Sequence, residues 1–537
     1  MAWYDSAVFY HIYPLGLCGC PHENHGEEGH HFGKLKAWAD HARKLGCTAI
    51  YIGPLFESEG HGYETTDYRK VDGRLGSNGE FKEYVSYCHS IGIRVIVDGV
   101  FNHTGRSFFA FQDLKANREN SRYRDWYCNV NFYGNNEYND GFSYDNWGGY
   151  NLLAKLNQWN PEVQNYLFDS VRFWVSEFDI DGIRLDAADV LDHGFMRQLR
   201  GLTDSLKPEF WLMGEVIHGD YSRWANGEML HSVTNYELHK GLYSGHNDHN
   251  YFEIAHSVRR LLGICGNTLL YTFVDNHDVE RLATKLNNRE HLCPVMILNY
   301  TLPGIPSLYY GTEFGIEGKK EWGSDWSLRP CLDLADYQNA YEDHELTHLI
   351  TQLGRCKQQY PELTYGEYKE LYLQNRQYAF ARVLDGRAVI VALNNDDRYA
   401  VISIPLPVAA TRATDILIEA EETTQDPLAE QAEKEHREAK KAKKLQLMAA
   451  DIRTALQRLQ AAANTLTGSG EDTCTIEQLR SDADGLTSLI NDYAHEFRMP
   501  LAMQAPPREI EGPQLHIQDG RLEVQLPANQ GTLIYVE

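Results

Sequence analysis

The sequence has no long hydrophobic run and no excess of positive charge. No stretch of about 18 or more apolar residues, as a membrane-spanning helix requires, occurs in the 537-residue chain. The first residues, MAWYDSAVFYHIYPL, lack the basic, apolar and small-residue order of an export signal. The net charge of −26 argues against nucleic acid or an anionic membrane as a partner, because both bind clustered positive charge. We therefore expect a cytoplasmic protein whose substrate is not recruited by charge.

The ten cysteines lack a repeating spacing, which favours reduced thiols over a disulfide framework. The densest group of metal-binding residue types is CGCPHENHGEEGHH (residues 18–31), with two cysteines and four histidines. It has no paired CxxC or HxxxH spacing, so we expect a loop at the substrate cleft rather than a zinc site.

With 42% hydrophobic and 23% charged residues, the chain can bury a large core in two or three domains. Short apolar segments, read as strands, are Val8–Tyr13, Ala49–Ile52, Val95–Val97, Gly182–Leu185, Trp211–Gly214, Val233–Tyr236, Leu269–Val274 and Ser307–Tyr310. Amphipathic segments between them, read as helices, include Phe32–Leu45, Glu80–Ile91, Pro161–Glu177 and His193–Leu206. Eight strands separated by helices predict an α/β fold, a (β/α)₈ TIM barrel, rather than a doubly wound sheet.

The composition also predicts the domain boundaries. We expect the barrel in residues 1–102 and 159–362, interrupted at 103–158 by a small excursion domain (domain B) whose 129–151 stretch is rich in Asn, Tyr and Gly. Alternating apolar residues in 363–422 and 501–537 predict a C-terminal antiparallel β-sandwich. Between its two parts, residues 423–500 show heptad spacing and predict a long helical hairpin, a coiled coil.

The hairpin allows two interpretations. Two heptad seams can cover each other, which favours a self-contained hairpin. The alternative is an arm that docks a protein partner or a second copy of the chain, giving a homo-oligomer.

Four apolar segments end in acidic or histidine residues: VIVDGVFNH (95–103), DGIRLDA (181–187), FWLMGEV (210–216) and TFVDNHD (272–278). A parallel barrel brings such strand ends to one face. Strand alternation places Arg184 and Asp186 on the same side, where the arginine would keep Asp186 ionised as a carboxylate nucleophile requires. Glu215 follows an apolar run that would raise its pKa and suit a general acid. One acid such as Asp278 could equally be a salt bridge or cap, but three on separate strand ends indicate a site.

DGVFNHT (98–104), GIRLDAADV (182–190), GEV (214–216) and FVDNHD (273–278) resemble the four ordered signatures of the α-amylase family, glycoside hydrolase family 13. HGYETTDY (61–68), PGIPSLYYGTE (303–313) and GSDWSLRP (323–330) resemble further stretches usual in that family. LAKLN (153–157) is similar to the MPKLN motif of the neopullulanase, maltogenic amylase and cyclomaltodextrinase group, but Leu153 and Ala154 replace Met and Pro. Residues 188–190 read Ala-Asp-Val where that group usually has Ala-Asn-Glu. The resemblance covers residues 10–330 and, in outline, the C-terminal sandwich, but not the helical insertion.

The resemblance implies a retaining glycosidase acting on α-glucans such as malto-oligosaccharides, cyclodextrins or pullulan. Asp186 would be the nucleophile, Glu215 the acid/base, and Asp278 the carboxylate that binds hydroxyls of the reacting sugar. The reaction would pass through a covalent glycosyl-enzyme, and transglycosylation would follow when a sugar hydroxyl replaces water.

The same resemblance assigns substrate-binding residues. Tyr63 would stack on the reacting sugar, His103 and His277 would hydrogen-bond it, and Arg184 would orient Asp186. Without the flanking motifs, each histidine would be read as a structural residue. Trp224 could form an aglycone platform, although core packing explains it almost as well.

No cofactor is required by this chemistry. Asn102 is a calcium ligand in many family members, so the resemblance allows a calcium ion, with Asp140 and Asp145 as further oxygen donors.

A rival interpretation is a non-catalytic member of the fold that binds partners through its helical arm. Such proteins usually lose a catalytic carboxylate and carry a membrane anchor. All three carboxylates are present here and no spanning segment is found, so we favour the enzyme.

Overall fold

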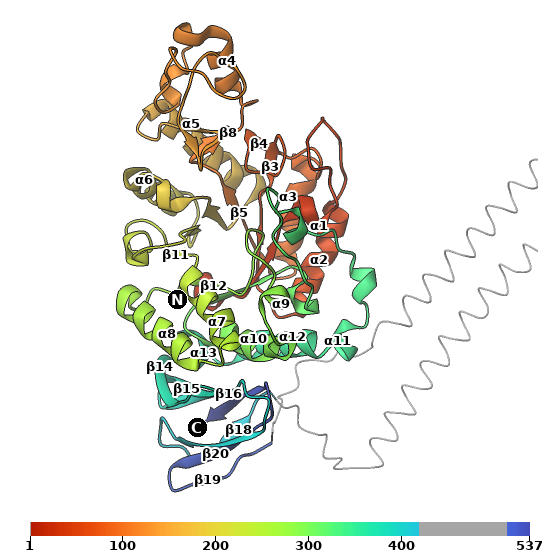
Figure 1. Ribbon diagram of the computed structural model, residues 1–537, viewed down its shortest axis with the longest axis vertical. Helices are drawn as coiled ribbons and strands as arrows, with labels where there is room; N and C mark the ends of the chain where they lie inside the picture. The colour runs from red at the N-terminus through yellow and green to blue at the C-terminus, as the bar shows by residue number, and fades with distance from the viewer. Residues whose placement is uncertain (1, 418–512) are drawn as a thin grey trace, which may run out of the picture. The chain divides into compact units, whose positions relative to one another are not determined.

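The computed structural model describes residues 2–417 and 513–537, and its largest element is a ring of eight parallel strands (Figure 1). In sheet order the strands are β11 (Ser232–Val233), β10 (Trp211–Gly214), β9 (Gly182–Leu185), β5 (Arg94–Gly99), β2 (Ala49–Ile52), β1 (Phe9–Ile12), β13 (Ile305–Tyr309) and β12 (Tyr271–Phe273). A single parallel bridge between Thr234 and Tyr271 joins the two ends of this order. The predicted barrel is confirmed.

Helices lie outside the ring (Figure 1). The long ones are α2 (Phe32–Lys44), α3 (Asn78–Ser90), α5 (Pro161–Phe173), α6 (His193–Leu206), α7 (Tyr236–Asn247), α8 (Tyr251–Cys265), α10 (Leu292–Thr301) and α12 (Glu345–Gln359). Shorter ones are α1 (Pro14–Leu17), α9 (Leu282–Lys285), α11 (Ala340–Asp343) and α13 (Glu362–Tyr365). In the part of the chain that the structure describes, no helix combines the length and apolarity needed to cross a bilayer.

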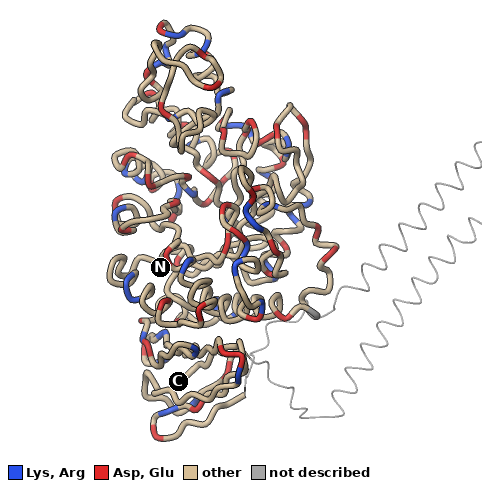
Figure 2. The backbone as a smooth tube through the Cα atoms, viewed as in Figure 1, with Lys and Arg blue, Asp and Glu red and all other residues tan. Residues whose placement is uncertain are grey.

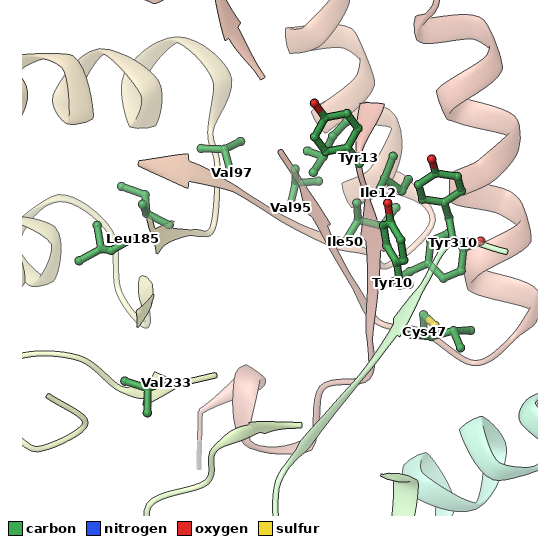
Figure 3. Close-up of a cluster of buried hydrophobic side chains, with 14 of the residues drawn as sticks. Tyr10, Ile12, Tyr13, Cys47, Ile50, Val95, Val97, Leu185, Val233 and Tyr310 are labelled. Atoms are coloured by element: carbon green, nitrogen blue, oxygen red, sulfur yellow. The ribbon is translucent and has the colours of Figure 1, made fainter. Parts of the chain in front are cut away.

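Strand alternation separates two cores. Outward residues such as Ile50, Val95 and Leu185 are fully buried against the helices, as Figure 3 shows. Inward residues such as Phe9 and Trp211 fill the barrel interior in a separate cluster. Each fully buried aliphatic side chain stabilises the fold by about 2 kcal/mol relative to exposure.

Local capping explains where predicted and observed boundaries differ. Helix α3 begins before the predicted Glu80, because Ser77 and Glu80 form a reciprocal capping box. The predicted strand Val233–Tyr236 ends at Val233, because the side chain of Asn235 accepts a hydrogen bond from the Leu238 amide and starts α7.

Between β5 and α5 the chain forms a small antiparallel sheet in the order β6-β8-β7, with helix α4 (Phe109–Asn117). Its strands are β6 (His103–Thr104), β7 (Asn146–Trp147) and β8 (Tyr150–Lys155). A hairpin of β3 (Phe56–Ser58) and β4 (Thr65–Val71) follows β2.

Two antiparallel sheets follow the barrel. One has the order β14-β15-β16-β21-β18 and the other β17-β20-β19. Their strands are β14 (Glu367–Leu373), β15 (Gln377–Leu384), β16 (Arg387–Asn394), β17 (Ala400–Pro405), β18 (Ala413–Asp415), β19 (Ile517–Gln518), β20 (Arg521–Leu526) and β21 (Gly531–Val536). A shared apolar cluster that includes Ile390, Ile402 and Val524 packs them together. The predicted hairpin at 423–500 lies outside the described residues. Along the described chain, Lys and Arg are interspersed with Asp and Glu (Figure 2).

Candidate active site

The strand ends bring three carboxylates onto one guanidinium. Arg184, near the end of β9, is paired in register with Asp98 of β5. Its Nη1 donates to Asp98 Oδ1 at 2.8 Å and to Asp186 Oδ1 at 2.9 Å. Its Nη2 lies 2.9 Å from Glu215 Oε2. The structure therefore gathers Arg184, Asp186 and Glu215 at one point, as the alternation of the strands predicts.

This cluster is open to solvent on the side of the acids. The side chains of Asp186 and Glu215 are 12% and 13% exposed, whereas that of Arg184 is 3% exposed. A substrate can therefore reach both carboxylates while the guanidinium stays beneath them.

Asp278 follows β12 and is held by two basic groups. His277 Nε2 lies 3.0 Å from Asp278 Oδ2, and Arg329 Nη2 donates to Asp278 Oδ1 at 3.0 Å. Arg329 Nε also donates to the carbonyl of His277 at 3.0 Å. Burial alone would raise the pKa of Asp278, but His277 and Arg329 outweigh burial and hold that pKa well below its usual range.

Asp186 and Glu215 behave in the opposite way. Burial raises the pKa of both carboxyls, and Arg184 opposes the rise without cancelling it. That Arg184 keeps Asp186 ionised stays a prediction: the guanidinium contacts Asp186 as expected, but it also binds Asp98 and Glu215. Asp186 and Glu215 bind the same guanidinium, so their titrations are linked.

Tyr63 and His103 line the same region. The Tyr63 hydroxyl contacts His277 Nε2, and its ring lies at 17° to the His277 ring. His103 Nε2 lies 3.1 Å from the Tyr63 carbonyl oxygen, and its Nδ1 lies 3.2 Å from the Asn102 amide nitrogen. Burial lowers the pKa of His103 to about 3, so this imidazole is neutral near pH 7. Both of its ring nitrogens have protein partners, so a sugar hydroxyl would have to displace one of them.

The structure adds residues that the sequence did not single out. Asp98 and Tyr51 form the floor, where the Tyr51 hydroxyl donates to Asp98 Oδ2 at 2.8 Å. Asp98 lies two residues after Ile96, which points into the barrel, so strand alternation could have identified Asp98 as an inward-facing residue. Arg329 lies within GSDWSLRP. Trp147, 40% exposed with its ring 6.2 Å from that of His103, comes from an irregular segment without a periodic signal.

Trp224 is not placed as a platform. Its indole is 6% exposed, and Gly219 and His193 pack close to it. These contacts favour the core-packing interpretation of Trp224 over an aglycone platform.

The described residues do not fit a calcium ion. Both oxygens of Asp140 accept from Arg106, at 2.7 and 2.9 Å, so a guanidinium already neutralises this carboxylate. Asp145 Oδ2 accepts from Asn129. Asn102 Oδ1 is buried without a partner, but calcium needs six to eight oxygen ligands. Across residues 2–417 and 513–537, no group of three or more His, Cys, Asp or Glu side chains is placed to hold a metal.

Comparison with known proteins agrees with this geometry. The model of the alpha amylase catalytic domain matches residues 28–362. A cyclomaltodextrinase of Thermoanaerobacter pseudethanolicus is 31% identical over 433 residues, covering 74% of this chain and 72% of that protein. An intracellular maltogenic amylase of Bacillus subtilis is 31% identical, covering 68% of this chain and 62% of that protein.

A solved cyclomaltodextrinase structure superposes with a TM-score of 0.69 and 28% identity, covering 78% of this chain and 75% of that one. The match to the catalytic-domain model extends over more than half of the chain and includes the strand ends that carry the acidic cluster. The chain therefore belongs to the alpha-amylase family of glycosidases.

Proposed function

We propose that this glycosidase cleaves α-glucosidic bonds in short α-glucans, such as malto-oligosaccharides, cyclodextrins or pullulan fragments, with retention of anomeric configuration. The observation that carries the proposal is the single Arg184 guanidinium that contacts both Asp186 and Glu215. Two carboxyls bound by one guanidinium suit the short carboxyl separation of retaining glycosidases, which favours a covalent intermediate. The names of the cyclomaltodextrinase and maltogenic amylase relatives support the substrate class.

In the first step, Glu215 acts as the general acid and gives a proton to the leaving glycosidic oxygen. Asp186 attacks the anomeric carbon as that bond breaks, and Arg184 stabilises its carboxylate. The Ala187 amide donates to Glu215 Oε2 at 3.0 Å, which fixes that oxygen and leaves the other to face the substrate. In the second step, Glu215 takes a proton from a water whose oxygen attacks the anomeric carbon, and the bond between that carbon and Asp186 breaks. A sugar hydroxyl in place of the water gives transglycosylation.

Asp278 has a different part in this proposal. His277 and Arg329 keep it ionised, so it can accept hydrogen bonds from hydroxyls of the reacting sugar throughout the reaction. The Tyr63 ring stacks on the same sugar, with His277 and His103 as hydrogen-bonding groups. These contacts position the anomeric carbon above Asp186.

The proposal needs no cofactor, because side chains supply the acid, the base and the nucleophile. Calcium is not included, because Arg106 already binds Asp140. A cytoplasmic location fits the nine described cysteines, which are all free thiols, and the name of the intracellular relative. An oligomer or partner contact through residues 423–500 rests on the sequence pattern alone.

The direct test is the stereochemistry of the product. We expect proton NMR during hydrolysis of maltotriose or a cyclodextrin to show the α-anomer first, with chromatography giving the linkage preference. Asp186→Asn should abolish turnover, whereas the control Asp189→Asn, on an exposed carboxylate nearby, should preserve it. A β-anomer as first product would contradict retention. A folded but inert wild type would favour the non-catalytic binding protein instead.

A further inference from the structure

Three cysteines meet at the turn that ends helix α1. Cys18 and Cys20 flank Gly19, whose φ of +68° places it in the left-handed region. A Cβ at Gly19 would lie 3.0 Å from the sulfur of Cys331 and 3.4 Å from its Cβ. The Cys331 sulfur thus sits on a turn that carries a thiol on each side.

The three thiols differ in accessibility. Cys331 is exposed, whereas Cys18 and Cys20 are 8% and 6% exposed. The Lys34 ammonium lies 3.6 Å from the Cys331 sulfur and can donate a hydrogen bond to it. Burial raises the pKa of the Cys18 thiol, and it raises that of Cys20 to about 12. The first thiol to react is therefore Cys331.

We propose that Cys331 is a reversible modification site, which reacts with a low-molecular-weight disulfide and then forms an intramolecular disulfide with one of the two thiols flanking Gly19. This goes beyond the glycosidase activity and does not depend on it. A metal ion is a weaker candidate here, because no metal-binding group of three such side chains is found among the described residues.

The chemistry balances in two exchanges. The Cys331 thiol gives its proton to solvent, and its thiolate attacks one sulfur of the small disulfide. The disulfide bond breaks, and one half leaves as a thiolate that takes up a proton. The Cys18 or Cys20 thiol then attacks the Cys331 sulfur, the bond from that sulfur to the other half breaks, and the proton of the attacking thiol passes to the departing half, which leaves as a second thiol. Two protein thiols are oxidised and one small disulfide is reduced to two thiols.

This bond would disturb the active site through Arg329, two residues before Cys331. Its carbonyl oxygen lies so close to Gly16 that a Cβ there would collide with it. The flanking thiols are each one residue away from Gly19, so closing the disulfide requires the 329–331 segment or the turn to shift. Since Arg329 holds the carboxylate of Asp278, such a shift loosens that contact and lowers turnover.

The experiment treats the reduced full-length protein with oxidised glutathione, blocks remaining thiols by alkylation and maps the peptides by mass spectrometry. We expect a cross-link from Cys331 to Cys18 or Cys20, a roughly tenfold fall in kcat, and recovery of both by dithiothreitol. Cys331→Ser should prevent the cross-link and the loss. The matched control Cys265→Ser, on a half-buried thiol of α8, should change neither.

Two results would overturn the proposal: glutathione adducts that form on other cysteines while Cys331 stays reduced, or an adduct on Cys331 that never exchanges. Lys34→Gln should slow the reaction of Cys331 with an aromatic disulfide about threefold, and an unchanged rate would contradict the role of the ammonium. Mass mapping needs no substrate, so failure of the proposed glycosidase function would leave this test intact.

Discussion

The same strands carry apolar side chains at one end of the barrel interior and charged side chains at the other. At the amino-terminal end, inward positions carry aromatic and apolar residues, and Phe9 stacks on Trp211 with ring centroids 4.8 Å apart. At the carboxyl-terminal end, inward positions on neighbouring strands carry Asp98, Arg184 and Glu215. Burying carboxylates that share one cation is unfavourable, and burying aromatic rings is favourable. This difference indicates that the apolar amino-terminal end stabilises the fold, whereas the charged carboxyl-terminal end serves catalysis at a cost in stability.

The largest effect should come from the charged end. Asp186→Asn removes the proposed nucleophile, and we expect kcat/KM to fall by about 10⁴-fold or more, close to 5.5 kcal/mol at about 1.36 kcal/mol per factor of ten. The melting temperature should stay the same or rise, because the substitution removes charge repulsion with Glu215. Calorimetry and a maltotriose assay measure the two quantities. An Asp186→Asn variant that retains activity would show that the charged end of the barrel does not carry the proposed nucleophile.

The neutral end should respond in the opposite way. Trp211→Ala should lower the free energy of unfolding by about 3–5 kcal/mol, because the fully buried ring loses its packing and leaves a cavity. Turnover per folded molecule should hardly change, as urea unfolding and activity assays together would show. Trp322→Ala is the matched control, since that indole is fully exposed. Loss of turnover without loss of stability would mean that the two ends are not separate.

Arg329→Gln sharpens the comparison within the charged end. The variant removes a charge-assisted hydrogen bond, so the pKa of Asp278 should rise and kcat/KM should fall about tenfold, equivalent to ~1.4 kcal/mol. Asp278 must be ionised, but its pKa lies below that of Asp186, so the acidic limb of the pH profile follows Asp186 and the pKa of Asp278 is better followed directly by carboxyl-carbon NMR. Arg329→Lys should restore part of the shift. An Asp278 pKa that stays in place in Arg329→Gln would show that Arg329 does not govern Asp278.

The smallest effect is expected at Trp147. Its partly exposed ring beside His103 suits a substrate contact, so Trp147→Ala should raise KM by about three- to tenfold and leave stability nearly unchanged. Tyr133→Ala is the control in the same segment, because Tyr133 is fully exposed. Equal KM values for the two variants would remove Trp147 from the site.

The barrel and the meeting of Asp186 with Glu215 could be predicted because both follow from periodicity. Side chains two residues apart on a strand point to the same face, so Arg184 and Asp186 can be placed on one side of β9 without knowledge of the other strands. The division of Arg184 among three carboxylates could not be predicted, because it depends on register and burial across different strands. The predicted strand Val233–Tyr236 is shorter in the structure, because the cap at Asn235 starts α7 despite the apolar character of the segment.

The barrel is closed between β11 and β12 by the single bridge between Thr234 and Tyr271. Every other seam is held by a ladder of at least two residue pairs, whereas this seam has a single bridge, in which the Asn235 amide donates to the Tyr271 carbonyl at 2.9 Å. Thermal fluctuations should open the barrel first between β11 and β12. The Asn235 amide should therefore exchange with deuterium sooner than the amides of the other barrel strands.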